Sequence, residues 1–327
     1  MTVVLFSCWN RRIMEQDITT NDLLGNRDVF ADVANVNLFE GKRLILPEDL
    51  EMVPLETSYK DLEGKHHRLF RDTLMKVRKL GGCIAFIGYE SQTDINRTMP
   101  VRDMGYTYTG YAKQIREIVA KNNADRNSAY TKVLHEHQKL MPMATFILYF
   151  GEEEWKTPLS LMDILDIPKE EKEFWKNLIH DYPIHVIHMA KQPEEVRKKY
   201  QSDYGVIADY LAYHKDKEKV DRHLRQDNRR LVHVEQVLDM LQVFSGDKRF
   251  EEIKKTYIEN DGKKECDTMC LLLDACEERG MQQKAKDIAK NLLKIGLLSV
   301  TVIAQSTGLS VEEVEALAKE EMNDLKV

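Results

Sequence analysis

Residues 84–102 read IAFIGYESQTDINRTMPVR and carry the clearest information about the architecture of this chain. Their apolar start, Ile84–Ile87, predicts a buried strand that carries Glu90 and Gln92 at its end. Side chains alternate along a strand, so Glu90 and Gln92 lie on the same face of it. After a few polar residues, apolar positions recur at helical spacing over Met99–Asn122. We therefore expect a buried strand followed by a long helix.

A second acidic residue, Asp72, lies on the segment just before this strand. His67–Lys79 alternates in polarity and predicts a strand, and Gly81-Gly82 predicts the turn that leads back into the buried strand. With a simple two-residue turn, Asp72 would lie opposite Ser91 and on the wrong face of the sheet. Asp72 and Glu90 share a face only if a three-residue loop or a bulge lies between them. We expect such an irregularity, and a regular hairpin would exclude a shared site.

The remaining patterns predict a domain of mixed helices and strands, followed by helices alone. An apolar stripe predicts a helix over Asn26–Leu38, with Asn26 as its N-cap and Gly41 as its stop. Three further apolar runs predict strands, around Met52–Tyr59, Met143–Phe150 and Ile184–Met189. Beyond Lys191 the strand patterns end, and charged helical patterns continue, broken near Gly246, Asp261-Gly262 and Gly308.

These elements divide the chain into three parts. Residues 1–14 are expected to be a disordered leader, with Met14 as an alternative start. Residues 15–190 give a helix, a three-strand meander, a helix and a further strand, which is an α/β core. Residues 191–327 are expected to form an α-helical C-terminal region.

Composition sets limits on the class of protein. The 327 residues are 43% hydrophobic and 31% charged, as in a globular chain, and their formal net charge is −7. This charge excludes a protein whose whole surface coats nucleic acid, although a local basic cleft remains compatible with it. No apolar run is long enough to cross a bilayer. Five unevenly spaced cysteines indicate reduced thiols, which fit a cytoplasmic protein.

The polar residues at the strand ends suggest a chemistry. Asp72 and Glu90 bring two carboxylates together, and Mg²⁺ prefers carboxylate oxygens. Hydrolysis of a phosphodiester needs such an ion to polarise the phosphate and to activate water. On spacing alone, ordinary polar residues on a strand surface are the better explanation, because an Asp followed by Glu-x-Gln is common. The apolar strand before Glu90 and the Met-Pro-x-Arg after it reverse this preference.

The segment also resembles the recombination-promoting nuclease (Rpn) family, a transposase-like branch of the PD-(D/E)XK nucleases. In that family an Asp opens one strand, Glu-x-Gln ends the next, and Met-Pro-x-Arg begins the following helix. Asp72, Glu90 with Gln92, and Met99-Pro100-Val101-Arg102 match these positions. The resemblance covers about Met14 to Lys191. It implies a PD-(D/E)XK core, with a mixed sheet flanked by helices, and a metal-dependent DNA endonuclease linked to recombination or mobile elements.

The resemblance also assigns roles to residues. Asp72 and Glu90 would bind Mg²⁺ or Mn²⁺, and Gln92 would orient water where most PD-(D/E)XK enzymes have a Lys. Asp32, on the first predicted helix, is a candidate third metal ligand, and a solvated helix Asp is the equal alternative.

DNA contacts are expected from arginines near these acids. Arg102 falls in the first turn of a helix, where phosphate binds well, and a structural ion pair is the alternative. Arg71, in a locally basic stretch over residues 65–79, and Arg97, just before the helix, are further candidates. A solvated strand face is the commoner explanation of such a basic stretch.

Two functional classes follow. The first is a Mg²⁺-dependent DNA endonuclease with Asp72, Glu90 and Gln92 as its catalytic residues. The alternative is a catalytically degenerate nuclease fold that binds DNA or protein. DNA is the expected partner, no membrane association is expected, and cleavage of two strands by one site per chain would favour a homodimer.

Two other motifs have simpler explanations. Glu136-His137-Gln138 repeats the E-x-Q pattern in a polar stretch, which we expect to be a solvent-facing helix. Val300–Leu317 is similar to a helix–turn–helix, but its second helix is rich in Glu, which phosphate would repel. We expect this pair of helices to serve packing or self-association.

Overall fold

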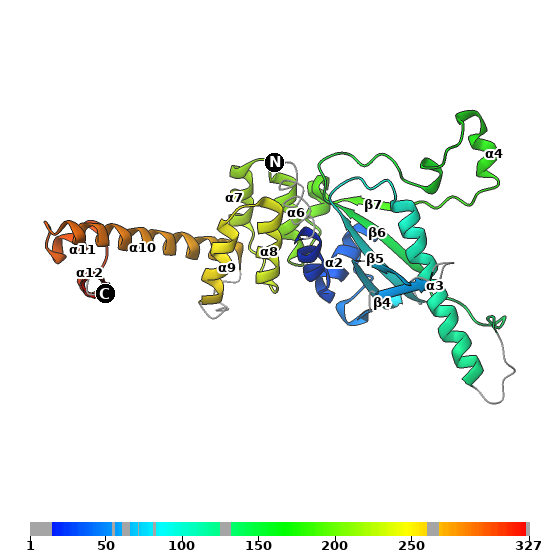
Figure 1. Ribbon diagram of the computed structural model, residues 1–327, viewed down its shortest axis with the longest axis horizontal. Coiled ribbons are helices and arrows are strands. Elements are labelled where there is room, and N and C mark those ends of the chain that lie inside the picture. The colour runs from blue at the N-terminus through cyan, green and yellow to red at the C-terminus, as the bar shows by residue number, and fades with distance from the viewer. Residues whose placement is uncertain are drawn as a thin grey trace.

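The computed structural model describes residues 15–53, 56–60, 66–70, 72–80, 83–124, 132–259 and 268–324. Figure 1 shows a sheet at one end of the molecule, a group of short helices in the middle, and a long helical arm that carries the C-terminus. The expected leader, residues 1–14, lies outside the described residues, as do Arg71, Gly81-Gly82 and Asp261-Gly262.

The sheet has five strands in the order β1-β4-β5-β6-β7. Their bounds are Leu50–Met52 (β1), Thr73–Leu80 (β4), Cys83–Gln92 (β5), Met143–Tyr149 (β6) and His185–His188 (β7). β1, β4 and β5 pair antiparallel, whereas β5, β6 and β7 pair parallel. The expected α/β class with a mixed sheet is therefore confirmed, and β5 is its central strand.

Two expected strands are divided in the structure. The segment expected as one strand around Met52–Tyr59 forms the end of β1 and then β2 (Glu56–Lys60). The segment expected over His67–Lys79 forms β3 (His66–Phe70) and then β4. β2 and β3 pair with each other in a separate two-stranded sheet. The three-strand meander of the main sheet is thus β1-β4-β5, with a hairpin inserted between β1 and β4.

The expected irregularity between Asp72 and Glu90 is confirmed. At the turn, Leu80 pairs with Cys83, but from Val77 onward the pairs are shifted by one residue, with Val77 opposite Ala85 and Thr73 opposite Tyr89. Two residues of β4 face one residue of β5 at this bulge. The shift moves Asp72 to the position opposite Glu90.

Helices pack on both faces of the sheet (Figure 1). α2 (Arg27–Leu38) covers one face, where the ring centroids of Phe30 and the fully buried Tyr89 lie 4.6 Å apart. α3 (Met99–Ala124) covers the other face, and its first residue packs with Ile147 and Tyr149 of β6. The helices expected at these two places are confirmed. A further helix, over residues 15–24, precedes α2.

Short elements connect the strands. The 3₁₀ helices are η1 (Pro47–Asp49), η2 (Leu161–Asp163), η3 (Lys169–Glu171) and η4 (Met189–Lys191). α4 (Lys172–Lys176) lies on the long connection between β6 and β7, which extends away from the sheet (Figure 1). The second E-x-Q motif, residues 136–138, lies in exposed turns, so the helix expected there is wrong for the described residues 132–140.

Beyond Lys191 the described residues form helices, as expected. The bounds are Glu194–Arg197 (α5), Tyr204–Tyr213 (α6), Lys217–Gln226 (α7), Val234–Ser245 (α8), Arg249–Glu259 (α9), Met269–Ile295 (α10), Val300–Thr307 (α11) and Val311–Asp324 (α12). Gly246 and Gly308 end α8 and α11 in the left-handed conformation, which confirms two of the expected breaks. A domain boundary at residue 191 stays a prediction, and one cluster of buried side chains runs from the sheet through α2 into α6–α10.

The last three helices have a small core of their own. α11 and α12 fold back on the end of α10, where Ala289, Ile303, Ala304, Val314 and Leu317 are buried together. Both helices use apolar side chains to pack within the chain, and the exposed surface of α12 begins with Glu312 and Glu313. The helix–turn–helix pattern therefore corresponds to a packed helix pair at the end of the arm.

None of the helices in the described part of the chain combines the length and apolar character needed to cross a membrane.

Candidate functional site

The two acids expected to form the site lie next to each other on the sheet. Because Thr73 pairs with Tyr89, Asp72 stands one step further, opposite Glu90. Alternation along β5 points Glu90 to the α3 face, since Tyr89 belongs to the α2 face. Asp72 lies in the bend just before β4, where Ser91, Arg102 and Asn21 interact with its carboxylate. The backbone N–H of Ser91 donates a 2.6 Å hydrogen bond to Oδ2 of Asp72. This bond fixes the Asp72 carboxylate at the end of β5.

Arg102 from the first turn of α3 binds the second acid. Its Nη2 atom lies 2.6 Å from Oε1 of Glu90 and also donates a 2.8 Å hydrogen bond to the hydroxyl of Tyr106. The side chain of Glu90 is only 1% exposed, whereas that of Arg102 is 36% exposed. The buried carboxylate therefore has a cation that reaches it from the solvent side. For Arg102, a structural ion pair was the expected alternative to phosphate contact, and the structure contains such an ion pair.

The environment of Asp72 favours its protonated form more than water does. Burial raises the pKa of Asp72, and this effect outweighs the Ser91 hydrogen bond, the charge of Arg102 and a hydrogen bond from Asn21, which all lower it. Burial also raises the pKa of Tyr106, and the charge of Glu90 adds to that effect. The cluster thus combines two enclosed carboxylates with one arginine.

A third acid, Asp17, belongs to this cluster and was missed by the sequence reasoning. Asp17 lies on the helix over residues 15–24, one turn before Asn21. Burial and the charge of Asp72 raise the pKa of Asp17 to about 6, although Arg102 lowers it. The local sequence carries no signal for this position, because an acid and an amide at i, i+4 are common on helix surfaces. The first helix was also expected to begin only at Asn26.

Asp32 does not lie beside Asp72 and Glu90, which corrects its expected position as a third metal ligand. Its Oδ2 atom accepts hydrogen bonds from the backbone N–H groups of Gln201 and Ser202, both at 2.8 Å. α2 presents this carboxylate to the segment before α6, because the face of α2 that meets the sheet is apolar. Asp32 has a structural role there as an acceptor for backbone amides.

Gln92 and Arg97 line a pocket of about 370 Å³ beside the acids. The pocket is formed by the end of β5, the connection to α3 and Asp17. Nε2 of Gln92 donates to the carbonyl of Ser91 at 2.7 Å and lies 3.4 Å from Oε1 of Glu90. Arg97 is exposed at the rim. The expected pair of Glu90 and Gln92 thus shares one face, and Gln92 connects the acids with open space.

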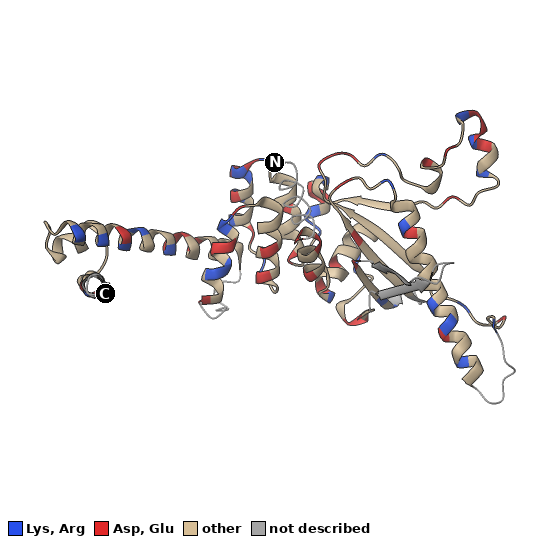
Figure 2. Ribbon diagram, viewed as in Figure 1, with Lys and Arg blue, Asp and Glu red and all other residues tan. Residues whose placement is uncertain are grey.

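The basic stretch is partly neutralised where the structure describes it. On β4, Nη2 of Arg78 lies 2.7 Å from Oε2 of Glu51, and Nζ of Lys76 lies 4.0 Å from the same atom. Arg71 lies outside the described residues. In the view of Figure 2, acidic and basic residues alternate over the helices and along α10. Arg97 is therefore the cation that lines the pocket, and Arg102 lies on Glu90 beside it.

The carboxylates at this site meet part of the coordination that a small hard cation such as Mg²⁺ requires. Among the described residues, no three His, Cys, Asp or Glu side chains are grouped closely enough to hold a metal ion. Two carboxylates suffice for Mg²⁺ when substrate phosphate and water complete its coordination. Asp72 and Glu90 are such a pair, but the guanidinium of Arg102 lies against Glu90. A divalent ion would have to share or replace that contact.

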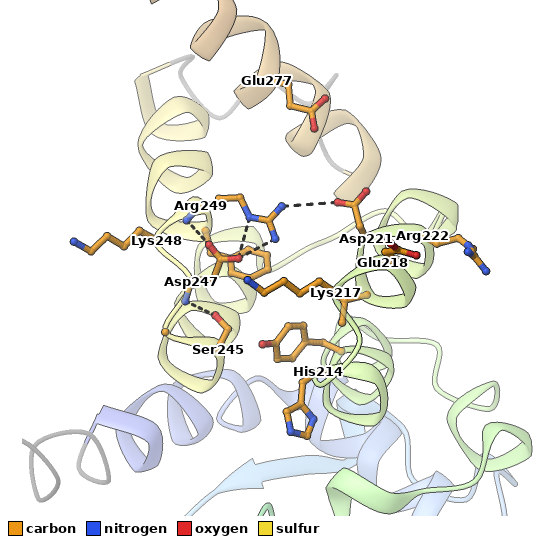
Figure 3. Close-up of a pocket in the computed structure, with 14 residues that line it drawn as sticks. His214, Lys217, Glu218, Asp221, Arg222, Ser245, Asp247, Lys248, Arg249 and Glu277 are labelled. Carbon is orange, nitrogen blue, oxygen red and sulfur yellow. Dashed lines mark hydrogen bonds and ion pairs between the residues drawn. The ribbon is translucent and has the colours of Figure 1, made fainter.

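A larger pocket lies elsewhere, in the helical region. It has a volume of about 950 Å³ and is lined by α6, α7, the turn between α8 and α9, and α10 (Figure 3). Its charges are balanced within the protein. Nη2 of Arg249 lies 2.8 Å from Oδ2 of Asp247, and Nη1 lies 3.9 Å from Oδ1 of Asp221. The sequence offered no motif for this pocket, and it does not adjoin the acid cluster.

No family model, no curated protein and no solved structure matches this chain.

Proposed function

We propose that this chain is a Mg²⁺-dependent DNA endonuclease of the Rpn type, with a PD-(D/E)XK core. One observation carries the proposal: a bulge in β4 places Asp72 opposite Glu90 on the face that Arg102 and Gln92 also occupy. A strand pair with ordinary surface polarity has no need of such a shift. The shifted register also gives a physical reason for the sequence spacing between Asp72 and Glu90.

Each residue has a distinct part in the proposed hydrolysis. Asp72 and Glu90 would hold the divalent cation, Mg²⁺ or Mn²⁺, which polarises a phosphate and lowers the pKa of water. Gln92, at the edge of the pocket, would orient the attacking water by hydrogen bonding. The water oxygen forms a bond to phosphorus, the bond from phosphorus to the leaving oxygen breaks, and that oxygen takes up a proton. Arg97 and Arg102 would bind the phosphate oxygens.

DNA is the proposed partner, and the pocket at the end of β5 is its proposed point of entry. Cleavage of both strands by one site per chain would need two copies, so we propose a homodimer for that activity. The described cysteines Cys270 and Cys276 are free thiols, in line with the reducing cytoplasm that we propose as the compartment.

A second function is favoured by the same ion pair. Because Arg102 already neutralises Glu90, the cluster is also stable as a purely structural arrangement. The chain would then be a degenerate nuclease fold that binds DNA or protein without cleaving it.

Nicking of supercoiled plasmid distinguishes the two functions. Wild-type protein is assayed with Mg²⁺, with Mn²⁺ and with EDTA, next to Asp72→Asn and Asp32→Asn. Asp32 is a matched control, since it is a half-buried Asp that lies outside the cluster. The nuclease is supported if cleavage needs metal, is lost in Asp72→Asn and persists in Asp32→Asn. Cleavage that survives in Asp72→Asn rejects this site, and DNA binding without cleavage supports the degenerate fold.

A further inference from the structure

Glu90 is the most enclosed charge of the acid cluster, and the flexible side chain of Arg102 brings a positive charge to it. The carboxylate is 1% exposed, and Oε1 lies 2.6 Å from Nη2 of Arg102. Loss of a nearby cation destabilises an enclosed carboxylate. Movement of Arg102 away from Glu90 therefore favours binding of another cation there.

The two partners are held very differently. Glu90 belongs to the central strand β5, between β4 and β6, and its backbone is fixed on both sides. Arg102 reaches the carboxylate with a long side chain from the first turn of α3. Its Nη2 atom makes the contacts to Glu90 and Tyr106, and Nη1 lies 3.6 Å from the sulfur of Met99. The arginine is the partner that can move, since its side chain is partly exposed.

We propose that Arg102 is an exchangeable counter-cation: it neutralises Glu90 until a divalent ion takes its place, and the freed guanidinium then binds the substrate phosphate. This inference rests on the proposed nuclease function. Asp72 and Glu90 carry two negative charges when ionised, and Arg102 supplies one positive charge. A divalent ion carries one more positive charge than Arg102, so the exchange compensates more of the negative charge of Asp72, Glu90 and Asp17.

The freed arginine has a second cation near it, since Arg97 stands on the connection just before α3. The backbone N–H groups of Val101 and Arg102 already donate to the carbonyl of Thr98, so the two guanidinium groups would bind the phosphate. A phosphate bound there holds Arg102 away from Glu90. Metal and DNA then stabilise the same arrangement, and each must raise the affinity of the protein for the other.

Binding of Mn²⁺, measured by electron paramagnetic resonance and calorimetry, tests this exchange without relying on cleavage. The samples are wild type, Arg102→Gln and Arg116→Gln, each with and without a nuclease-resistant oligonucleotide. Arg116 is the control, an exposed arginine about four turns further along α3. Glu90→Gln shows whether the bound ion is the one at this site.

Removal of the competing guanidinium should strengthen Mn²⁺ binding. Arg102→Gln is expected to bind Mn²⁺ about fivefold or more tightly than wild type in the absence of DNA. The oligonucleotide is expected to tighten Mn²⁺ binding in wild type and Arg116→Gln, but to have little effect in Arg102→Gln. Tyr106→Phe, which keeps the charge of Arg102 but removes the hydroxyl that contacts both the guanidinium and Glu90, should give a smaller gain.

Two outcomes overturn the inference in different ways. If Mn²⁺ binds and depends on Glu90, but Arg102→Gln and Tyr106→Phe bind it no more tightly than wild type, Arg102 is only a structural partner. In that case the proposed function stands without the exchange. If wild type and both variants bind no Mn²⁺ with or without DNA, the proposed metal-dependent function fails, and the exchange fails with it. Tyr106→Phe decides the question if Arg102→Gln does not fold.

Discussion

Oε1 of Glu90 and Nη2 of Arg102 lie 2.6 Å apart, although the two residues belong to a central strand and to the helix that covers it. The strand holds the acid in place, and the helix brings the base to it after the polar connection over residues 93–98. This contact ties the position of α3 to the end of β5. The contribution of this ion pair to the free energy of unfolding can be measured without substrate.

The ion pair should show strong coupling in a double-mutant cycle. Arg102→Gln leaves Glu90 buried without its arginine, so we expect a loss of about 3 kcal/mol in the free energy of unfolding. Glu90→Gln combined with Arg102→Gln removes both charges and should cost less than the sum of the single changes. Urea denaturation at neutral pH in EDTA measures all three. Additive losses would show that the pair contributes no coupling.

Asp17 should make the free energy of unfolding depend on pH. Its pKa is about 6 when folded, against 3.8 for the free side chain, so the folded state takes up the proton more readily. Asp17 therefore destabilises the fold above about pH 6, and this effect fades as the pH falls towards 4. Asp17→Asn should be more stable than wild type at pH 8, by on the order of 1 kcal/mol after allowance for solvent screening.

Thermal unfolding of wild type and Asp17→Asn from pH 4 to pH 8 measures this difference. Asp32→Asn is a suitable control, because it replaces a carboxylate outside the cluster. A stability gap that stays constant over the whole range would contradict the assignment of the effect to Asp17.

The bulge in β4 predicts unequal effects of two deletions. Deleting Lys79 removes the extra residue but keeps Val77 opposite Ala85, so Asp72 stays opposite Glu90. Deleting Lys76 instead shifts the register of the β4 residues before it by one. Met75 then leaves the buried face of the sheet, and Asp72 takes a position on that face. We expect soluble, folded protein with Lys79 deleted and unfolded or insoluble protein with Lys76 deleted.

Circular dichroism and melting curves of the two deletion variants provide the measurement. If both deletions unfold the protein, the strand tolerates no change of length. If both leave it folded, the register of β4 is not fixed by its buried face.

Two glycines should respond in opposite ways to alanine. At Gly205, in α6, a Cβ atom would collide with the guanidinium of Arg229, which Asp209 and Asp227 hold in place. Gly205→Ala should therefore lower the free energy of unfolding by about 2 kcal/mol. Gly280, inside α10, has open space around it, and alanine there should stabilise the helix by up to about 1 kcal/mol. Chemical denaturation compares the two variants, and equal effects would contradict the packing at Gly205.

Much of the sheet could be predicted because its pattern is local. The apolar runs that became β5, β6 and β7, and the helical spacing of α3, are each visible within one segment. The bulge could be predicted because only a shifted register lets Asp72 and Glu90 share a face. The inserted hairpin β2-β3 was harder, because an alternating strand looks the same in either sheet.

The composition of the acid cluster depended on tertiary structure. Asp32 and Asp17 both lie on N-terminal helices, and nothing in the local sequence says which helix end meets β5. The structure decides it through packing, since α2 presents Val29, Phe30 and Val33 to the core and turns Asp32 towards Gln201. The binding of Arg102 to Glu90 was foreseen only as the alternative to phosphate contact, because residue spacing does not reveal where a long side chain ends.

The five buried side chains at the end of α10 are shared with no residue of the main core. Opening of α11 and α12 therefore costs what those five side chains and the half-buried Leu292, Leu293, Val300 and Leu309 around them contribute, and the sheet and its acid cluster remain intact while it happens. The tip of the arm is a unit of local unfolding, and brief exposure to a protease would trim it before the rest of the molecule is cut.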